Sequence, residues 1–124
     1  MSIEFESAAT VFVVKDVAAS AAHYRDAFGF AIAFGYGGET PVYAGVERGG
    51  VIIHLHAQAH ANKEPGHGVV YCFVQGVDEL YEQIKSAGAR VLKAPQDYPY
   101  EMRDFDVLDP DGNRLVFGQC TKKA

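Results

Sequence analysis

The sequence predicts an α+β fold of two related halves, each in the order strand, helix and three further strands. A β-branched run at Thr10–Lys15 precedes an apolar stripe of helical spacing over residues 17–28, which Gly29 follows. A second run at Val69–Val74 precedes a second stripe, which Gly88 follows. Because the order of elements and both glycine stops agree, a repeated supersecondary unit is the best explanation. Asp16 is expected to cap the first helix.

Short strands separated by turn residues complete each half. They are expected at Phe30–Gly35, Pro41–Val46 and Val51–Ala57 in the first half, and at Arg90–Lys93, Arg103–Leu108 and Arg114–Gln119 in the second. The polar, small residues between the halves predict a linker. We therefore expect one domain over residues 1–124, with module one at about 8–57, the linker at about 58–67 and module two at about 68–120.

Alternation along the strands predicts two unlike faces for each sheet. Ile53 and Leu55 point to one side of their strand, whereas His54 and His56 point to the other. The uniformly apolar set should pack under the helices. We expect the strands to form a curved mixed sheet with the helices on its convex side. The side chains of the second set, apolar and polar, should line the concave cleft that this sheet encloses.

Composition narrows the classes of function. The formal net charge of -5, with scattered basic residues, argues against nucleic-acid binding and slightly favours a cationic ligand. No apolar run reaches the length of a membrane span. Acidic residues stand near the N-terminus, where a signal peptide carries basic ones. The sequence thus predicts a soluble, cytoplasmic protein that binds neither nucleic acid nor membrane.

Two motifs resemble those of a known family. The first leads from Val13-Val14-Lys15-Asp16-Val17 to Phe28-Gly29-Phe30, and the second leads from Pro99-Tyr100-Glu101-Met102-Arg103 to Asp109-Pro110-Asp111-Gly112-Asn113-Arg114-Leu115. With the duplicated order, they make the chain resemble the vicinal oxygen chelate superfamily, in its glyoxalase/bleomycin-resistance/dioxygenase group. The resemblance covers nearly the whole chain. It implies paired βαβββ modules, usually in a homodimer, whose modules pair within or between chains.

The resemblance also implies where a metal would bind. Catalytic members hold a divalent metal with four side chains, and the matching positions here are Ala9, His54, Val69 and Val116. Only His54 has a donor atom, whereas such metals take three or more oxygen or nitrogen ligands. The chain is therefore most similar to the metal-free bleomycin-resistance type, and we expect no cofactor, no metal ligands and no catalytic residues.

These observations predict a protein that binds a small hydrophobic or aromatic molecule, as in antibiotic sequestration and resistance, without catalysing a reaction. Because the chain has no tryptophan, phenol and phenyl rings would have to stack on the ligand. The predicted ligand-binding residues are His54, His56, Tyr71, Phe73, Tyr98, Tyr100 and Arg103. Simpler interpretations are that the rings fill the cleft or pack at a dimer interface, and that Arg103 pairs with Asp104 or Asp106 at the surface.

Two alternatives stay open. The first is a divalent-metal-dependent lyase, isomerase or dioxygenase with a relocated site that includes His54 and His56, together with His60 or His67 from the linker. The second is a protein whose dimer face is the functional surface and whose cleft is filled by its own side chains.

Overall fold

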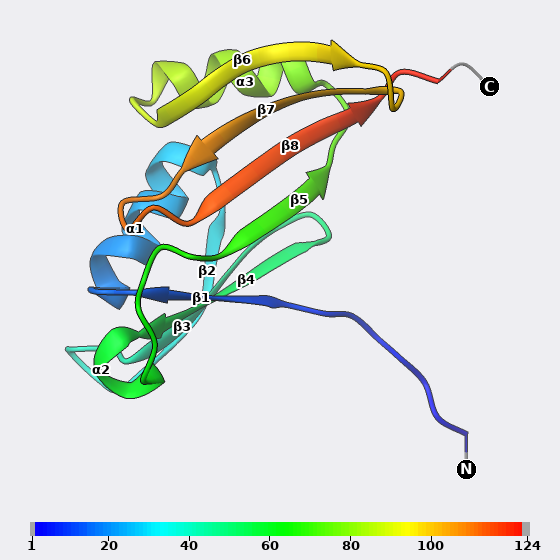
Figure 1. Cartoon of the computed structure of the whole chain (residues 1–124). Coiled ribbons are helices and arrows are strands. Elements are labelled where there is room, and N and C mark those ends of the chain that lie inside the picture. The colour runs from blue at the N-terminus through cyan, green and yellow to red at the C-terminus, as the bar shows by residue number, and fades with distance from the viewer. Residues whose placement is uncertain (1, 123–124) are drawn as a thin grey trace.

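The computed structural model describes residues 2–122 and repeats one order of elements in both modules (Figure 1). Module one contains β1 (Thr10–Val14), α1 (Val17–Phe28), β2 (Ala31–Tyr36), β3 (Tyr43–Arg48) and β4 (Val51–Ala57). Module two contains β5 (Val69–Phe73), α3 (Val77–Ser86), β6 (Arg90–Tyr98), β7 (Met102–Leu108) and β8 (Arg114–Cys120). A short helix, α2 (Gln58–Ala61), lies in the predicted linker. The α+β class and the two βαβββ modules are confirmed.

Helix α1 begins and ends at the residues that the sequence predicts. The Asp16 carboxylate accepts a 3.0 Å hydrogen bond from the amide of Ala19, which satisfies one of the unpaired donors of the first turn. Gly29 has a φ of 73°, the left-handed conformation that a side chain disfavours. The local sequence alone therefore sets both ends of this helix.

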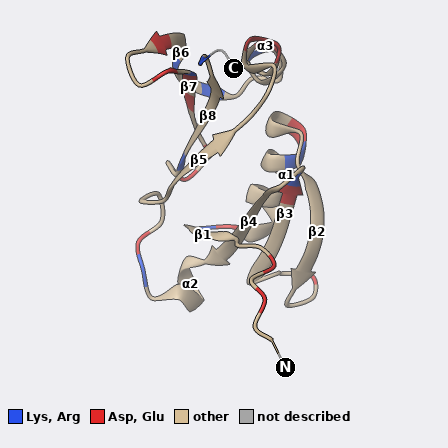
Figure 2. Ribbon diagram, turned by 90° about the vertical axis from the view of Figure 1, so that its right-hand side faces the viewer, with Lys and Arg blue, Asp and Glu red and all other residues tan. Residues whose placement is uncertain are grey.

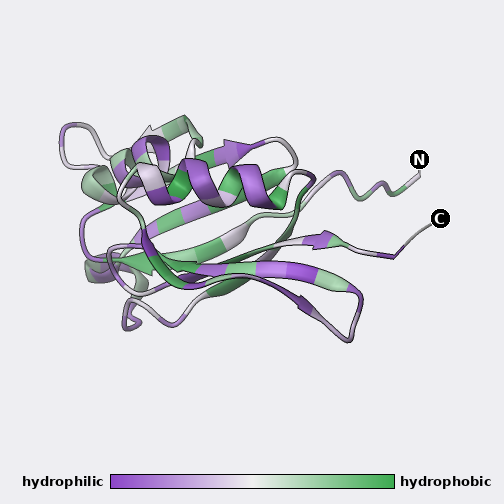
Figure 3. Cartoon of the chain, turned by 90° about the horizontal axis from the view of Figure 1, so that it is seen from above, coloured by the Kyte–Doolittle hydropathy of each residue, from purple (hydrophilic) through white to green (hydrophobic). Residues whose placement is uncertain are grey.

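Helix α3 is capped instead by a residue far away in the sequence. The side-chain oxygen of Gln119, on β8, accepts hydrogen bonds from the amides of Gly76 and Val77 at 2.8 and 2.9 Å. Val77 and Ile84 are the buried residues of this helix, and Figure 3 shows hydrophobic and hydrophilic residues alternating along it. No helix within residues 2–122 has the length and apolarity that crossing a membrane requires.

The strands form two separate four-stranded sheets, in the orders β1-β4-β3-β2 and β5-β8-β7-β6. Strands β1 and β4 pair in parallel, as do β5 and β8, and the other pairs are antiparallel. Strand β6 runs well beyond the predicted Arg90–Lys93, because its pairing with β7 resumes at Gln96 after a register shift. Pro95 lies within that shift, where a missing amide donor is tolerated.

One hydrophobic core joins the two modules. Helices α1 and α3 cover one face of each sheet, and both helix-covered faces contribute to the same cluster of buried side chains. Ile53 and Leu55 lie in it fully buried, as their alternation predicts, together with Phe105 and Leu115 of module two. The other face of each sheet is covered by neither α1 nor α3 and is called its open face below; α2 borders that of module one beside Val11, Val13 and His56. Figures 1 and 2 show that the two open faces turn outward in different directions.

The turn between β7 and β8 also connects the modules. Asn113 is fully buried, and its side-chain amide donates a 3.1 Å hydrogen bond to the carbonyl of Val13 on β1. Its side-chain oxygen accepts a 2.9 Å hydrogen bond from the amide of Gly68, just before β5. Asp111 accepts a 3.0 Å hydrogen bond from the amide of Lys15. The closing motif therefore fixes the position of module two on module one.

Candidate functional site

The open face of module one carries a cluster of four rings, called the module-one cluster: Phe34, Tyr43, His54 and His56. The register of β3 and β4 places Tyr43 opposite His56 and Gly45 opposite His54. The Tyr43 hydroxyl lies 2.9 Å from Nδ1 of His54, within hydrogen-bonding distance. The ring of Phe34 meets that of His54 edge to face at 5.4 Å between centroids. These contacts give each ring of the cluster a defined orientation.

Two strand glycines allow aromatic rings to lie directly against the sheets. On module one, the ring of Phe34 crosses β3 over Gly45, where any Cβ would overlap the ring. On module two, the phenol of Tyr71 crosses β8 over Gly118 in the same way. A glycine inside a strand commonly marks such a close approach. Each open face thus contains one ring that is seated on a glycine.

Asp104, on β7, is the polar centre of the open face of module two. Its side chain is 1% exposed, and its Oδ2 accepts hydrogen bonds of 2.9 Å from the hydroxyls of both Tyr71 and Tyr100. Its Oδ1 accepts a 2.7 Å hydrogen bond from Nζ of Lys93, on β6. These residues, together with Tyr98, form a group that is called the module-two wall below.

The module-two wall presents a pair of stacked phenol rings. The rings of Tyr98 and Tyr100 lie 5.1 Å apart between centroids, with an angle of 6° between their planes. The ammonium of Lys93 lies 4.1 Å from the centroid of the Tyr98 ring and also donates a hydrogen bond to the Tyr98 hydroxyl. Tyr100 is 58% exposed, so its ring is accessible to a ligand.

Interaction with one carboxylate shifts the pKa of several groups in the wall. Burial and the hydrogen bond to Asp104 raise the pKa of both Tyr71 and Tyr100. Burial alone would raise the pKa of Asp104, but hydrogen bonds from Lys93, Tyr100 and Tyr71 outweigh it and lower that pKa. Burial opposes the charge of Lys93, and hydrogen bonds to Asp104 and Tyr98 overcome it and raise the pKa of the ammonium. At neutral pH Asp104 is therefore a carboxylate, Lys93 is an ammonium, and Tyr71 and Tyr100 are neutral phenols.

A second carboxylate on β7 balances the charges of this face. Nζ of Lys93 lies 3.6 Å from Oδ1 of Asp106, and the guanidinium of Arg114 lies 3.5 Å from its Oδ2. Oδ1 of Asp106 is buried and accepts no hydrogen bond from the described residues. Two carboxylates and two cations thus share the open face of module two.

The structure divides the predicted ligand-binding residues between three places. His54 and His56 lie on the open face of module one, whereas Tyr71, Phe73, Tyr98 and Tyr100 lie on that of module two. Arg103 lies on the helix-covered side of β7 and pairs with Asp78 at 2.9 Å and Asp97 at 3.3 Å. The predicted surface pairing of Arg103 with Asp104 or Asp106 is therefore wrong, because neighbouring residues of a strand point to opposite faces.

Asp104 and Lys93 were absent from the predicted site. A signal for Asp104 exists in the sequence, since Asp104 and Asp106 alternate with Phe105 and Val107, both of which are fully buried. That parity alone places the two carboxylates on the open face. No comparable signal exists for Lys93, because the register shift in β6 interrupts the alternation there.

The residues present do not fit the metal site that the resemblance describes. Of its four positions, Ala9, Val69 and Val116 have no donor atom, and His54 alone could supply only one ligand. Within residues 2–122, no group of three or more His, Cys, Asp and Glu side chains could hold a metal ion. His67 borders a cavity with His56, Lys63 and Glu64, and His60 lies exposed on α2. A relocated site built on His54 and His56 lacks the further ligands that it would need.

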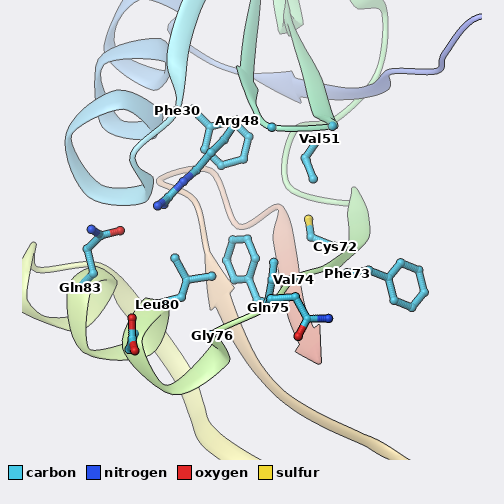
Figure 4. Close-up of a pocket in the computed structure, with 14 residues that line it drawn as sticks. Phe30, Arg48, Val51, Cys72, Phe73, Val74, Gln75, Gly76, Leu80 and Gln83 are labelled. Carbon is cyan, nitrogen blue, oxygen red and sulfur yellow. The ribbon is translucent and has the colours of Figure 1, made fainter. Parts of the chain in front are cut away.

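A cavity of about 480 Å³ lies between the modules, away from both clusters of aromatic residues (Figure 4). Its walls are the turn between β3 and β4, with Arg48 and Val51, and helix α3, with Leu80 and Gln83. The end of β5, with the predicted ligand-binding residue Phe73, also borders it. A second cavity, of about 580 Å³, borders Tyr71 and Phe73 together with residues 8–10. The second cavity reaches the edge of the open face of module two, whereas the first lies on the helix-covered side.

Known proteins resemble this chain in both sequence and fold. Residues 7–117 match the family model described as Glyoxalase/Bleomycin resistance protein/Dioxygenase superfamily. Bleomycin resistance proteins of Geobacillus stearothermophilus and Staphylococcus aureus are 42% identical to the chain over 50 residues. That stretch is 40% of this chain and only 38% of the length of these curated relatives.

Two solved structures share the fold over nearly the whole chain. TioX from Micromonospora sp. ML1 aligns with a TM-score of 0.83 at 22% identity, covering 94% of this chain and 99% of TioX. The bleomycin-binding protein from Streptomyces verticillus, solved in complex with copper(II)-bleomycin, aligns with a TM-score of 0.76 at 26% identity. That alignment covers 94% of this chain and 97% of the bleomycin-binding protein.

Proposed function

We propose that this chain, which belongs to the Glyoxalase/Bleomycin resistance protein/Dioxygenase superfamily, binds an aromatic or otherwise apolar small molecule without transforming it. The observation that carries the proposal is that both open faces expose oriented aromatic rings, while three of the four expected metal positions, Ala9, Val69 and Val116, are apolar. Phe34, Tyr71 and Tyr100 are 43%, 37% and 58% exposed. Exposed apolar surface of this kind commonly marks a ligand or partner site.

The ligand that we propose is an antibiotic or a molecule of similar size with at least one planar ring. The bleomycin resistance proteins and the bleomycin-binding protein among the relatives support this class. A planar ring would stack on the Tyr98–Tyr100 pair and against the rings of the module-one cluster. The net charge of -5 would also favour the approach of a cation from a distance. Sequestration of this kind would take place in the cytoplasm.

We further propose that the complete site forms between two copies of the chain. The open faces of one chain turn in different directions, so the module-one cluster and the module-two wall do not face each other within one chain (Figure 2). Strands β1 and β5 are edge strands, and Val11, Val69 and Phe73 on them are 51%, 56% and 77% exposed. In a homodimer, module one of one copy facing module two of the other would enclose a cleft and cover these side chains.

Calorimetry on the EDTA-treated protein tests this function, with metal-free bleomycin and copper(II)-bleomycin as probes. We expect binding without added metal, and we expect Tyr100→Ala to weaken it. Arg103→Ala is the matched control, because Arg103 lies on the helix-covered side of β7. Binding that appears only after addition of Zn, Ni, Mn or Fe, with the same metal found by elemental analysis of the untreated protein, would instead support the metal-dependent enzyme.

A further inference from the structure

The Asp104 carboxylate joins three segments of module two. Tyr71 comes from β5, Lys93 from β6 and Tyr100 from the turn before β7, and each donates a hydrogen bond to it. Asp104 as a whole is 1% exposed, so a ligand reaches the groups around its carboxylate rather than the carboxylate oxygens.

We propose that Asp104 is the positioning residue of the module-two wall, because it holds Tyr71 and Tyr100 in place. Asp104 also keeps the ammonium of Lys93 in the wall. The wall would therefore bind a planar aromatic group that carries no positive charge. This inference rests on the proposed function, because it specifies which part of a ligand the wall would bind. It assigns to Asp104 a role through Tyr71 and Tyr100, which would contact the ligand.

The hydroxyls of the wall are already committed. Those of Tyr71 and Tyr100 both donate to Asp104 at 2.9 Å, which leaves their ring faces and edges for a ligand. The Tyr71 ring is also confined by its seat on Gly118. Because the rings are held before a ligand arrives, binding would not have to order them, and this lowers its entropic cost.

The positions beside the two carboxylates and over the Tyr98 ring are likewise already occupied by cations of the protein. The ammonium of Lys93 lies over the Tyr98 ring at 4.1 Å, 2.7 Å from Asp104 and 3.6 Å from Asp106. Arg114 takes the other oxygen of Asp106 at 3.5 Å. A positively charged group could therefore reach these two carboxylates only by displacing Lys93 or Arg114.

The positioning role can be tested without any ligand. In Asp104→Asn, we expect the near-ultraviolet circular dichroism of the tyrosines to decrease, and Tyr71 and Tyr100 to ionise at lower pH in a spectrophotometric titration. Asp78→Asn removes one carboxylate from the opposite side of the sheet and should change neither signal. If Asp104→Asn does not fold, Asp104→Glu keeps the charge and all seven tyrosines but moves the carboxylate away from the two hydroxyls, and it should lower the same dichroism. Unchanged tyrosine signals in either folded variant would overturn the role.

The preference of the wall for an uncharged group can be tested with two probes that share one ring system and differ in charge. We expect the metal-free, full-length protein to bind 2-naphthylmethanol about tenfold more tightly than (2-naphthylmethyl)trimethylammonium, which corresponds to about 1.4 kcal/mol. Lys93→Met should narrow or reverse the ratio. Tighter binding of the cation by the unmodified protein would overturn the preference. Binding of neither probe, with the tyrosine signals intact, would overturn the aromatic-binding function and leave the positioning role of Asp104 standing.

Discussion

The hydroxyl of Tyr24 donates a 2.9 Å hydrogen bond to Oδ2 of Asp109, and this contact joins α1 of module one to the turn after β7 in module two. Both residues are buried, at 0% and 1% exposure. Oδ1 of Asp109 accepts hydrogen bonds of 2.9 Å from the amides of Asp111 and Asn113. One carboxylate therefore shapes the turn and connects the modules. Burial and the neighbouring Asp109 raise the pKa of Tyr24, so the phenol stays protonated and remains a donor.

Replacing Tyr24 by Phe should destabilise the protein by about 1–3 kcal/mol, because a buried carboxylate oxygen would lose a donor. The measurement is urea unfolding followed by far-ultraviolet circular dichroism. Tyr81→Phe is the control, since the ring of Tyr81 packs against Phe105 while its hydroxyl makes no hydrogen bond within residues 2–122. Equal free energies of unfolding for the two variants would show that the contact between Tyr24 and Asp109 contributes little.

The features that could be predicted from the sequence are those with local causes. Asp16 and Gly29 act within one turn of the helix that they bound, so the limits of α1 could be predicted to the residue. The alternation of Ile53 and Leu55 with His54 and His56 fixed the two faces of β4 for the same reason. Pairing of strands across a sheet has no such local cause.

The arrangement around Asp104 could not be predicted, because it depends on distant segments. Lys93 reaches Asp104 across the shifted register of β6 and β7, and Tyr71 reaches it across β8. The sequence predicts Arg103 as a ligand contact, but Asp104 points to the open face of β7, and two neighbouring residues of one strand point to opposite faces. The directions in which the two open faces point depend on how the modules pack together. The motifs within each module do not specify that packing.

Gly118→Ala should destabilise the protein by about 1–3 kcal/mol, because the new Cβ would overlap the phenol of Tyr71 and force it to move. Moving that ring would also weaken its hydrogen bond to Asp104. Gly35→Ala is the matched control, since Gly35 lies in β2 with open space around its Cβ position. Thermal unfolding and near-ultraviolet circular dichroism measure both effects. A Gly118→Ala protein as stable as Gly35→Ala would contradict the close seating of Tyr71.

The lowered pKa of Asp104 predicts a dependence of stability on pH. Because the folded-state pKa lies below the unfolded value of about 3.9, the stabilisation is present above that value and is lost as the pH falls through the folded pKa. The groups that face this carboxylate are Lys93, Asp106, Tyr71 and Tyr100.

We therefore expect the difference in free energy of unfolding between the unmodified protein and Asp104→Asn to be largest near neutral pH and to shrink below about pH 4. Urea titrations at a series of pH values give this difference directly. Asp78→Asn controls for the loss of one carboxylate from an exposed ion pair. A difference that grows on acidification would mean that Asp104 is not stabilised in its ionised form.

The proposed homodimer predicts that a charge on an edge strand will separate the copies. Val11, on β1, is 51% exposed and is not among the residues proposed to contact a ligand. In Val11→Glu, we expect sedimentation to show monomers at a concentration where the unmodified protein is dimeric, because an interface would have to bury an unpaired carboxylate. Ser86→Glu adds the same charge at the exposed end of α3 and should leave the dimer intact.

Val11→Glu also distinguishes a ligand site formed between two copies of the chain from a site that lies on one chain. If module one of one copy and module two of the other enclose the ligand, monomeric Val11→Glu should bind metal-free bleomycin at least tenfold more weakly, since each open face would supply only one wall. Unchanged affinity in the monomer would place the whole site on one chain, and the exposed rings of the other open face would then belong to the dimer interface alone.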